Sequence, residues 1–310
     1  MTMKKIAVMT SGGDAPGMNA FIRSVVRRGL ELGLEVYGII DGYQGLIEND
    51  ILKMNHDSVC NIIQQGGTIL KTSRSAEFMT SEGRKKAADN LNKLGIEGLI
   101  CCGGDGSYAG LKAFANLESG EWKGKVIGAP GTIDNDVDRT DYTIGFDTAV
   151  NTAVEAIDKL RDTGDSHNMH FIVEVMGRHC GDIAKAVGIA SGAVNVLIPE
   201  TRSDVDEVLN SIRDYGHNIT VVAEGDETGG AMILAETLKS KYCDPFKDRE
   251  YCKPNFRVCI LGHIQRGGSP TARDRILAHT MGAFAVEEII KGESLKATSI
   301  LEDKLCLQEI

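Results

Sequence analysis

The feature that most constrains the fold of this chain is a regular alternation of short apolar runs with longer amphipathic segments. Apolar runs of about four to eight residues are typical of buried strands, and apolar residues at about every third or fourth position are typical of helices. The first such pair is Lys5–Met9 and Asn19–Leu32, and the alternation continues to a last helix at Thr271–Lys291. Repeated strand–helix units predict an α/β fold with mainly parallel sheets and helices on both faces.

The remaining elements follow from the same periodicity and from glycines that close helices. The predicted strands cover residues 5–9, 34–40, 99–102, 125–129, 170–175, 195–198, 219–223 and 256–261. The predicted helices cover residues 19–32, 82–94, 107–117, 146–162, 182–190, 205–214, 231–239 and 271–291. The polar segment Cys243–Pro254 is predicted to be a loop.

Charge and composition exclude several classes of function. The 310 residues carry a formal net charge of −10, whereas a nucleic-acid-binding protein needs a basic surface, so no nucleic-acid partner is expected. No run of about 18 apolar residues is present, so no membrane-spanning helix is expected either. The start of the chain lacks the long apolar segment of a secretory signal. The eight cysteines contain no C-x-x-C pair, which favours reduced, buried thiols in a cytoplasmic protein. The length of the chain favours roughly two domains.

Glycine-rich segments follow five of the predicted strands. Ligands of open parallel sheets bind beyond the carboxyl ends of the strands, so these segments are the candidates for a functional site. They are TSGGDAPG (10–17), GGDGS (103–107), PGTIDND (130–136), MGRHCGD (176–182) and GHIQRGGSP (262–270).

The first three segments carry groups that suit phosphate and metal chemistry. A glycine turn that opens a helix brings backbone N–H groups close to a phosphate. Asp105 beside such a turn could bind Mg²⁺ or could merely cap the helix, and the sequence leaves both open. Thr132, Asp134 and Asp136 alternate along the chain, and an extended segment would place all three on one side. Such a group can accept a proton or bind a cation, and a polar turn is the alternative.

Arginines in the same loops point to phosphorylated ligands. Arg178 and Arg266 lie in the candidate segments, Arg257 starts the strand that leads into the last of them, and Arg74 lies in KTSRS (71–75). A guanidinium binds phosphate through two parallel hydrogen bonds. Any one of these arginines alone is more often a solvated surface residue. His263 is equally well explained as a neutral core or loop histidine or as a substrate contact. Together these residues indicate an enzyme of metal-assisted phosphoryl transfer, or a protein that binds nucleotides and sugar phosphates.

The sequence also resembles a known family, the bacterial ATP-dependent 6-phosphofructokinases. The resemblance covers about residues 4 to 290 and rests on motifs that occur in the same order. The motifs are TSGGDAPGMNAFIR, GGTILKTSR, GGDGS, PGTIDND, TDYTIGFDTA, VEVMGRHCGD, VVAEG and GHIQRGGSP.

The resemblance implies two three-layer, Rossmann-like domains with the active site in the cleft between them. It assigns residues 1–145 plus 265–310 to ATP binding and residues 146–264 to fructose 6-phosphate binding. The implied reaction is transfer of the ATP γ-phosphate to O1 of fructose 6-phosphate, the committed step of glycolysis, with Mg²⁺ as cofactor. The implied assembly is an allosteric homotetramer in which Arg257 reaches a neighbouring subunit's site.

Site residues are carried over where this sequence matches the motifs. The implied catalytic residues are Asp134 as proton acceptor, Thr132, Arg74 and Asp136, the last either orienting Asp134 or helping to hold the metal. The implied ATP-binding residues are Gly12, Arg74, Ser75, Gly104, Asp105, Gly106 and Ser107, with Asp105 on Mg²⁺. The implied fructose 6-phosphate residues are Thr132, Ile133, Asp134, Met176, Gly177, Arg178, Glu224, Arg257, His263 and Arg266. The implied allosteric residues are Arg23, Arg27, Arg161 and Gly192.

Several positions depart from the family pattern. Met169 stands where an arginine for the sugar 6-phosphate is usual, so weaker binding or a different phosphosugar is expected. In the effector site His56 replaces an arginine, Val194 replaces a carboxylate, and the lysines usual near 213–217 are absent. ADP or phosphoenolpyruvate is therefore expected to act weakly.

Two alternatives to an ATP-dependent kinase remain at this point. In pyrophosphate-dependent relatives, Asp and Lys stand at the positions that correspond to Gly106 and Gly131 of this chain. These glycines favour ATP. A non-catalytic regulatory subunit would have no need of a base such as Asp134.

Overall fold

The structure, a computed structural model, describes residues 3–116, 122–215, 219–242 and 255–310. These residues form two compact units. Unit 1 comprises residues 1–133, 137–147 and 266–310, and unit 2 comprises residues 134–136 and 148–265, apart from the undescribed residues within these ranges. The predicted loop Cys243–Pro254 lies outside the described residues.

Unit 1 is built on a seven-stranded sheet with the strand order β11-β10-β5-β4-β1-β2-β3. Its strands are β1 (Lys5–Thr10), β2 (Glu35–Ile39), β3 (Ile51–Met54), β4 (Gly98–Gly103), β5 (Lys125–Pro130), β10 (Lys296–Leu301) and β11 (Lys304–Glu309). The five central strands run parallel, and β3 and β11 are antiparallel at the two edges. The central strands are almost continuously buried, because a parallel sheet is covered on both faces.

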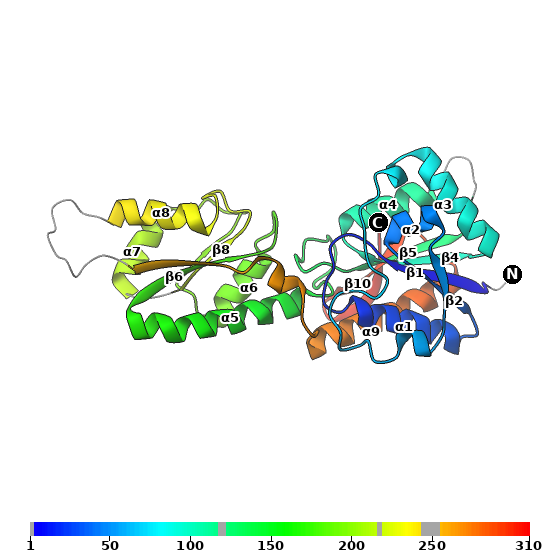
Figure 1. Cartoon of the computed structure of the whole chain (residues 1–310), viewed down its shortest axis with the longest axis horizontal. Coiled ribbons are helices and arrows are strands. Elements are labelled where there is room, and N and C mark those ends of the chain that lie inside the picture. The colour runs from blue at the N-terminus through cyan, green and yellow to red at the C-terminus, as the bar shows by residue number, and fades with distance from the viewer. Residues whose placement is uncertain (1–2, 117–121, 216–218, 243–254) are drawn as a thin grey trace. The chain divides into compact units, whose positions relative to one another are not determined.

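Helices cover both faces of this sheet (Figure 1). One face carries α1 (Met18–Glu31) and α9 (Ala272–Lys291), and the other carries α2 (Gly42–Glu48), α3 (Ser81–Leu94) and α4 (Asp105–Ala115). The core on the second side includes Ala7 and Met9 of β1 together with Tyr43, Leu91 and Leu111 of the three helices. The unit is therefore a three-layer sandwich, as the alternation of apolar runs predicts.

Unit 2 repeats this architecture around a smaller sheet, ordered β7-β8-β6-β9, in which all neighbours are parallel. Its strands are β6 (Met169–Val175), β7 (Asn195–Leu197), β8 (Ile219–Ala223) and β9 (Asn255–Ile260). Its helices are α5 (Phe146–His167), which begins in unit 1, α6 (Asp182–Ser191), α7 (Val205–Tyr215) and α8 (Ala231–Tyr242). Figure 1 shows α5 and α6 on one face and α7 and α8 on the other.

The predicted class, α/β with mainly parallel sheets, is confirmed, and every predicted strand and helix is present, most of them with ends shifted by a few residues. The prediction missed α2, β3, β10 and β11. Each lacks the signal that sequence reasoning needs: α2 is only seven residues long, and β10 buries the polar side chains of Thr298 and Ser299. Among the described residues, no helix has the length and hydropathy that crossing a membrane requires.

The thiols are less uniform than the sequence suggested. Cys101 and Cys102 of β4 are fully buried, as expected. The expectation of buried thiols is wrong for Cys60, which is exposed, and for Cys180, Cys259 and Cys306, which are partly exposed. Cys60 ends a short 3-10 turn on the surface of unit 1, outside the strands that form the core. All six described cysteines are free.

Thiol reactivity should follow this difference. Burial raises the pKa of Cys101 to about 12 and the pKa of Cys102 well above its usual value, so neither forms the reactive thiolate near neutral pH. We expect an aromatic disulfide reagent to label the native Cys60→Ser protein at one site fewer than wild type. Cys101→Ala should leave the native count unchanged and lower the count only after denaturation. A fast-reacting thiol lost with Cys101→Ala would contradict the buried placement.

Candidate active site

The glycine-rich turns of unit 1 meet at one edge of its sheet. Strands β5, β4 and β1 are neighbours, so the turns that follow them lie side by side. The backbone N–H of Gly131 donates to Gly103 O at 3.0 Å, and that of Ser11 donates to Cys102 O at 3.0 Å. A Cβ added at Gly12 would lie 3.5 Å from Ser107 Oγ. The first two predicted phosphate-binding segments are thus brought together.

The N-terminus of α4 opens directly from β4. Gly104 is the N-cap and Asp105 the first helical residue, so the interpretation of Asp105 as the N-cap is wrong. Its carboxylate is exposed in the first turn. A Cβ at Gly103 would lie 2.5 Å from Ser11 O, whereas one at Gly106 would meet nothing within 4 Å. The turn thus combines a helix N-terminus, open space at Gly106 and an oxygen ligand suited to Mg²⁺.

Tyr43 of α2 stabilises this turn through a hydrogen bond to its backbone. Its hydroxyl donates to the carbonyl of Ser107 at 2.6 Å, and its ring stacks on Phe78 with a centroid distance of 4.1 Å. Burial raises the pKa of Tyr43 well above its usual value, so the hydroxyl keeps its proton and remains a donor. Sequence reasoning missed this residue because nothing in the segment around it marks a role at a distant turn.

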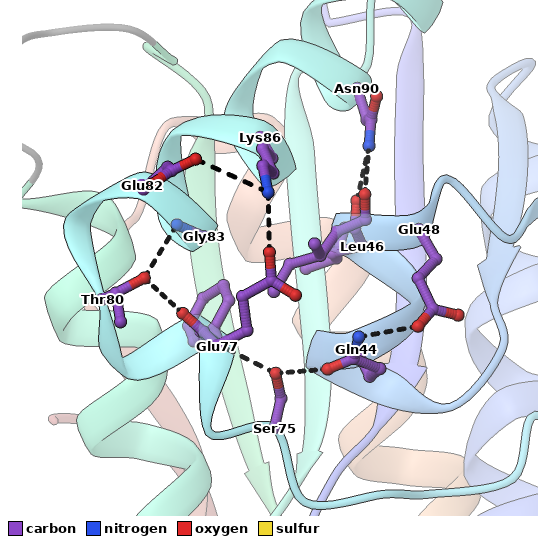
Figure 2. Close-up of polar contacts among 12 residues, drawn as sticks. Gln44, Leu46, Glu48, Ser75, Glu77, Thr80, Glu82, Gly83, Lys86 and Asn90 are labelled. Carbon is purple, nitrogen blue, oxygen red and sulfur yellow. Dashed lines mark hydrogen bonds and ion pairs between the residues drawn. The ribbon is translucent and has the colours of Figure 1, made fainter.

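The segment with Arg74 and Ser75 lies beside Gly12, because Thr72 Oγ1 donates to Gly12 O at 2.8 Å. Figure 2 shows that Ser75 Oγ is held within the protein: it donates to Gln44 Oε1 at 2.7 Å and accepts from the N–H of Phe78 at 3.1 Å. The hydroxyl of Ser75 therefore stabilises its own loop. The side chain of Arg74 is exposed.

The segment after β5 differs from the extended geometry that its alternation suggests. Asn135 has a left-handed backbone with φ 55°, so the alternation of sides breaks there. Thr132 and Asp134 are buried, with relative exposures of 9% and 1%, whereas Asp136 is exposed. The expectation that all three point to one side of an extended segment is wrong. The carbonyl of Thr132 accepts from Thr143 Oγ1 at 2.6 Å, and its neighbour Ile133 is fully buried.

Within unit 2, the turn after β6 surrounds Asp134. Arg178 Nε lies 3.4 Å from Asp134 Oδ2, and the N–H of Arg178 donates to Glu224 Oε1 at 2.8 Å. Arg178 has φ 53° and Gly177 has φ 143°, so the turn is held in a conformation that few residues adopt. A buried carboxylate is thus paired with the side chain of an arginine.

Gln265 is a residue of this region that sequence reasoning missed. Its Oε1 accepts the N–H of Met176 at 2.8 Å, and it is fully buried. The bond fixes the point at which β6 turns toward Arg178. Only its position in a candidate loop could have suggested it, since a glutamine carries no catalytic signal by itself.

Three further predicted sugar-phosphate residues occupy separate places. Arg257 is exposed on β9, the edge strand of the unit 2 sheet, and His263 is exposed in a 3-10 turn (Gly262–Arg266). In unit 1, Arg266 Nη1 donates to Asp14 O at 3.2 Å and lies over Gly13. A guanidinium is thus placed against the first glycine turn.

The predicted effector residues fall into two groups. Arg23 and Arg27 lie four residues apart on α1, hence on one face of that helix. In unit 2 the guanidinium of Arg161 donates to the carbonyl of Ser191, next to Gly192, the C-cap of α6 with φ 62°. The side chains of residues 213–217 lie outside those that the structure describes. The weak effector response stays a prediction.

Comparisons with known proteins agree on one family. The sequence profile described as Phosphofructokinase matches residues 5–289. A protein of Paenibacillus macquariensis named ATP-dependent 6-phosphofructokinase is 51% identical over 315 residues, covering 100% of this chain and 93% of its own length. One of the same name from Clostridium tetani is 50% identical over 313 residues, covering 99% and 93%. The phosphofructokinase structure from Saccharomyces cerevisiae superposes with a TM-score of 0.88 at 37% identity, and the match covers 98% of this chain and 44% of the yeast chain.

The contact between Tyr43 and Ser107 gives a stability prediction. Tyr43→Phe removes the hydroxyl that donates to Ser107 O, while that carbonyl keeps its place in the hydrogen bonding of α4, so the loss is that of one net hydrogen bond, about 0.5–1.5 kcal/mol. We expect the free energy of unfolding, measured by urea titration, to fall by about that amount. Tyr37→Phe is the control, because the hydroxyl of Tyr37 donates to a half-exposed carboxylate, Glu35, which water can solvate instead. Equal losses in the two variants would show that the bond to Ser107 contributes nothing special.

Proposed function

The chain belongs to the phosphofructokinase family, and on that premise we propose that it transfers the γ-phosphate of ATP to O1 of fructose 6-phosphate. The products are fructose 1,6-bisphosphate and ADP. The observation that carries the proposal is the carboxylate of Asp134, which is 1% exposed and lies 3.4 Å from Arg178 Nε. Burying a charge is costly even when it is paired, and a non-catalytic binding subunit has no need of that cost.

Asp134 is assigned as the general base. It takes the proton of the sugar O1 hydroxyl as the phosphoryl group arrives, and Arg178 favours its ionised form. Phosphoryl transfer depends mainly on positioning and on neutralising charge, so the protein needs little covalent chemistry. The backbone anchoring of Arg178 by Glu224 suits that requirement, since it fixes the guanidinium relative to the base.

The nucleotide is assigned to the turns of unit 1. The N-terminus of α4 and the Gly12 turn offer backbone N–H groups to the phosphates, and the exposed Arg74 neutralises the γ-phosphoryl group. Asp105 would hold Mg²⁺, which when bound neutralises the charge of the donor's phosphates. The role of Ser75 shifts from a side-chain ligand to a residue that shapes the Arg74 loop, because its hydroxyl is engaged by Gln44.

The sugar phosphate is assigned to Arg257, His263 and Arg266, and the sugar itself to Met176, Gly177, Arg178 and Glu224. Arg257 suits a site completed by a neighbouring copy in a homotetramer. It is exposed on an edge strand, and the nearby Ile260 and Ile264 expose 52% and 59% of their surface. Exposed apolar side chains of this kind favour contact with another chain.

The donor is assigned as ATP in preference to pyrophosphate. Gly106 faces open space in the first turn of α4, so a nucleotide meets no side chain there. Gly131 is a weaker indicator than the sequence suggested. A Cβ at that position would lie 2.4 Å from Cys102 Sγ, so glycine is required there by packing whatever the donor is.

A coupled assay of the purified full-length protein tests the assignment. With fructose 6-phosphate and Mg²⁺ we expect turnover with ATP and little with pyrophosphate. Asp134→Ala should lower kcat by about 10²–10⁴-fold, because the hydroxyl loses its general base, while both KM values change far less. Asp138→Ala, an exposed aspartate four residues along the chain, is the control and should keep wild-type kcat.

Two results would count against the proposal. Near-normal turnover of Asp134→Ala would remove the base from the mechanism, and comparable rates with ATP and pyrophosphate would overturn the donor assignment.

Met169 bears on the acceptor. A thioether has neither charge nor donor for a phosphate. Met169 pairs in register with Asn255, and Phe171 pairs with Arg257, so Met169 and Arg257 share one face of the sheet. His170 cannot take over, because it is buried and its Nε2 pairs with Thr220 Oγ1 at 2.9 Å. One phosphate contact is therefore missing beside Arg257.

Restoring the guanidinium should strengthen phosphate binding. A charged hydrogen bond is worth about 1.5–3 kcal/mol, so Met169→Arg should lower the KM for fructose 6-phosphate by roughly ten- to a hundredfold. The KM for ATP should stay unchanged, and Met169→Gln, which is uncharged, should give a much smaller effect. If wild type already saturates at low micromolar fructose 6-phosphate and Met169→Arg changes nothing, the interpretation of Met169 is wrong.

A further inference from the structure

The residue after the proposed base is anchored by a contact that the mechanism so far leaves unused. Asn135 follows Asp134 and has φ 55°. Its Nδ2 donates to Asp182 Oδ2 at 3.0 Å, and both residues belong to unit 2. Asparagine tolerates the left-handed conformation better than most residues, so this position combines a special backbone shape with a specific donor.

Asp182 is itself fixed from the other side. It is the first residue of α6, and its Oδ1 lies 3.2 Å from Lys185 Nζ one turn later. The same ammonium lies 3.5 Å from Glu200 Oε1, which also accepts the N–H of Gly181 at 2.7 Å. A network of charged and polar contacts therefore holds the start of α6 and, through it, the side chain of Asn135.

The same group of residues has the composition of a metal site. One ligand atom each of Cys180, Asp182 and Glu200 lies within 4.8 Å of the others. However, Lys185 already supplies a positive charge to both carboxylates, and Asn135 donates to the second oxygen of Asp182. The cluster is better explained as a support for the neighbouring turn, with a lysine in the place a cation would take.

The partner of the base is anchored in the same short stretch of chain. Arg178 lies four residues before Asp182, and its N–H is held by Glu224 at 2.8 Å. A Cβ added at Gly225 would lie 1.9 Å from Arg178 O, so the backbone of this turn packs tightly against the end of β8. Residues 178–182 thus contact Asp134 through a guanidinium and contact its neighbour Asn135 through a carboxylate.

We propose that Asn135 and Asp182 form a positioning pair that fixes the carboxylate of Asp134 against Arg178. The inference rests on the proposed function, in which Asp134 takes the proton of the sugar hydroxyl. Neither Asn135 nor Asp182 needs to touch the substrate. Their contact fixes the left-handed turn at Asn135 and thereby the orientation of the preceding Asp134 side chain. A small misplacement of a reacting group can cost about 10²-fold in rate.

The first test separates the side-chain donor from the backbone conformation. Asn135→Gly keeps the left-handed backbone and removes the bond to Asp182. We expect kcat to fall by about ten- to a hundredfold, with the KM for ATP unchanged. The matched control is Asn168→Gly, because Asn168 is an exposed asparagine of the same unit with φ 51°. This control should keep wild-type kcat.

The second test asks whether the pair itself matters. Asn135→Asp places two carboxylates against each other and should lower kcat at least as much as Asn135→Gly. Adding Asp182→Asn reverses donor and acceptor, so the double variant should recover at least part of the lost rate. A role limited to overall folding would give no such recovery.

Binding and stability readouts complete the design. The stoichiometry of ATP binding by calorimetry and the Tm report how much of each variant is folded. We expect both to stay near wild type while kcat falls. Unchanged kcat in Asn135→Gly, equal losses in Asn135→Gly and Asn168→Gly, or no recovery in the double variant would each overturn the positioning pair.

The proposed function is tested by wild type and Asp134→Ala, whereas the positioning pair is tested by the variants of Asn135 and Asp182. If wild type shows no phosphoryl transfer, or Asp134→Ala keeps its turnover, the proposed function fails before the pair is considered. If wild type and Asp134→Ala behave as proposed while Asn135→Gly is fully active, the positioning pair alone fails.

Discussion

The contact between Asp134 and Arg178 is the interaction on which the rest of the site depends. An almost fully buried carboxylate is tolerable only when a charge or several donors compensate for its lost solvation. The guanidinium at 3.4 Å supplies that charge, and Glu224 holds the backbone that carries it. Two residues with left-handed backbones belong to this contact: Asn135, which follows Asp134, and Arg178 itself. Their conformations orient the carboxylate and the guanidinium toward each other. The same geometry buries a carboxylate beside a guanidinium, which is the arrangement that the proposed proton acceptor uses.

The glycine turns of unit 1, to which we assign the nucleotide, depend on a different constraint, the close approach of neighbouring parallel strands. Their ends lie so near one another that Gly103 and Gly131 have no space for a side chain. The turns then expose backbone N–H groups at the start of α4, which is the chemistry that phosphates need. Tyr43, whose ring stacks on Phe78, stabilises this arrangement through a hydrogen bond from its hydroxyl to the carbonyl of Ser107. The glycines thus serve packing first, and their value for phosphate binding follows from it.

The proposed function assigns the phosphate donor to unit 1 and the base and sugar to unit 2, and this assignment decides which substitutions are informative. In the proposed function, changes at Gly106 or Arg74 test the donor site, whereas changes at Met169 or Asn135 test the acceptor site and the base. Met169 is the clearest departure from the family pattern, and it lies on the sheet face that also carries Arg257. The residues proposed as catalytic are present while the proposed phosphate contact at Met169 is not, so we expect the chain to keep the reaction and to bind its acceptor less tightly.

The sequence by itself determined the α/β class, because a period of two or 3.6 residues in the apolar pattern is a local property of strands and helices. It also located the candidate segments, since glycines and charges after strands are visible without coordinates. Only the tertiary structure decided how these segments are built. The burial of Asp134 and the exposure of Asp136 depend on one left-handed residue, and the roles of Tyr43, Gln265 and Asp182 depend on partners 64, 89 and 47 residues away. Contacts over such separations leave no periodic signal in the chain, because they arise only when the sheet brings distant turns to one edge.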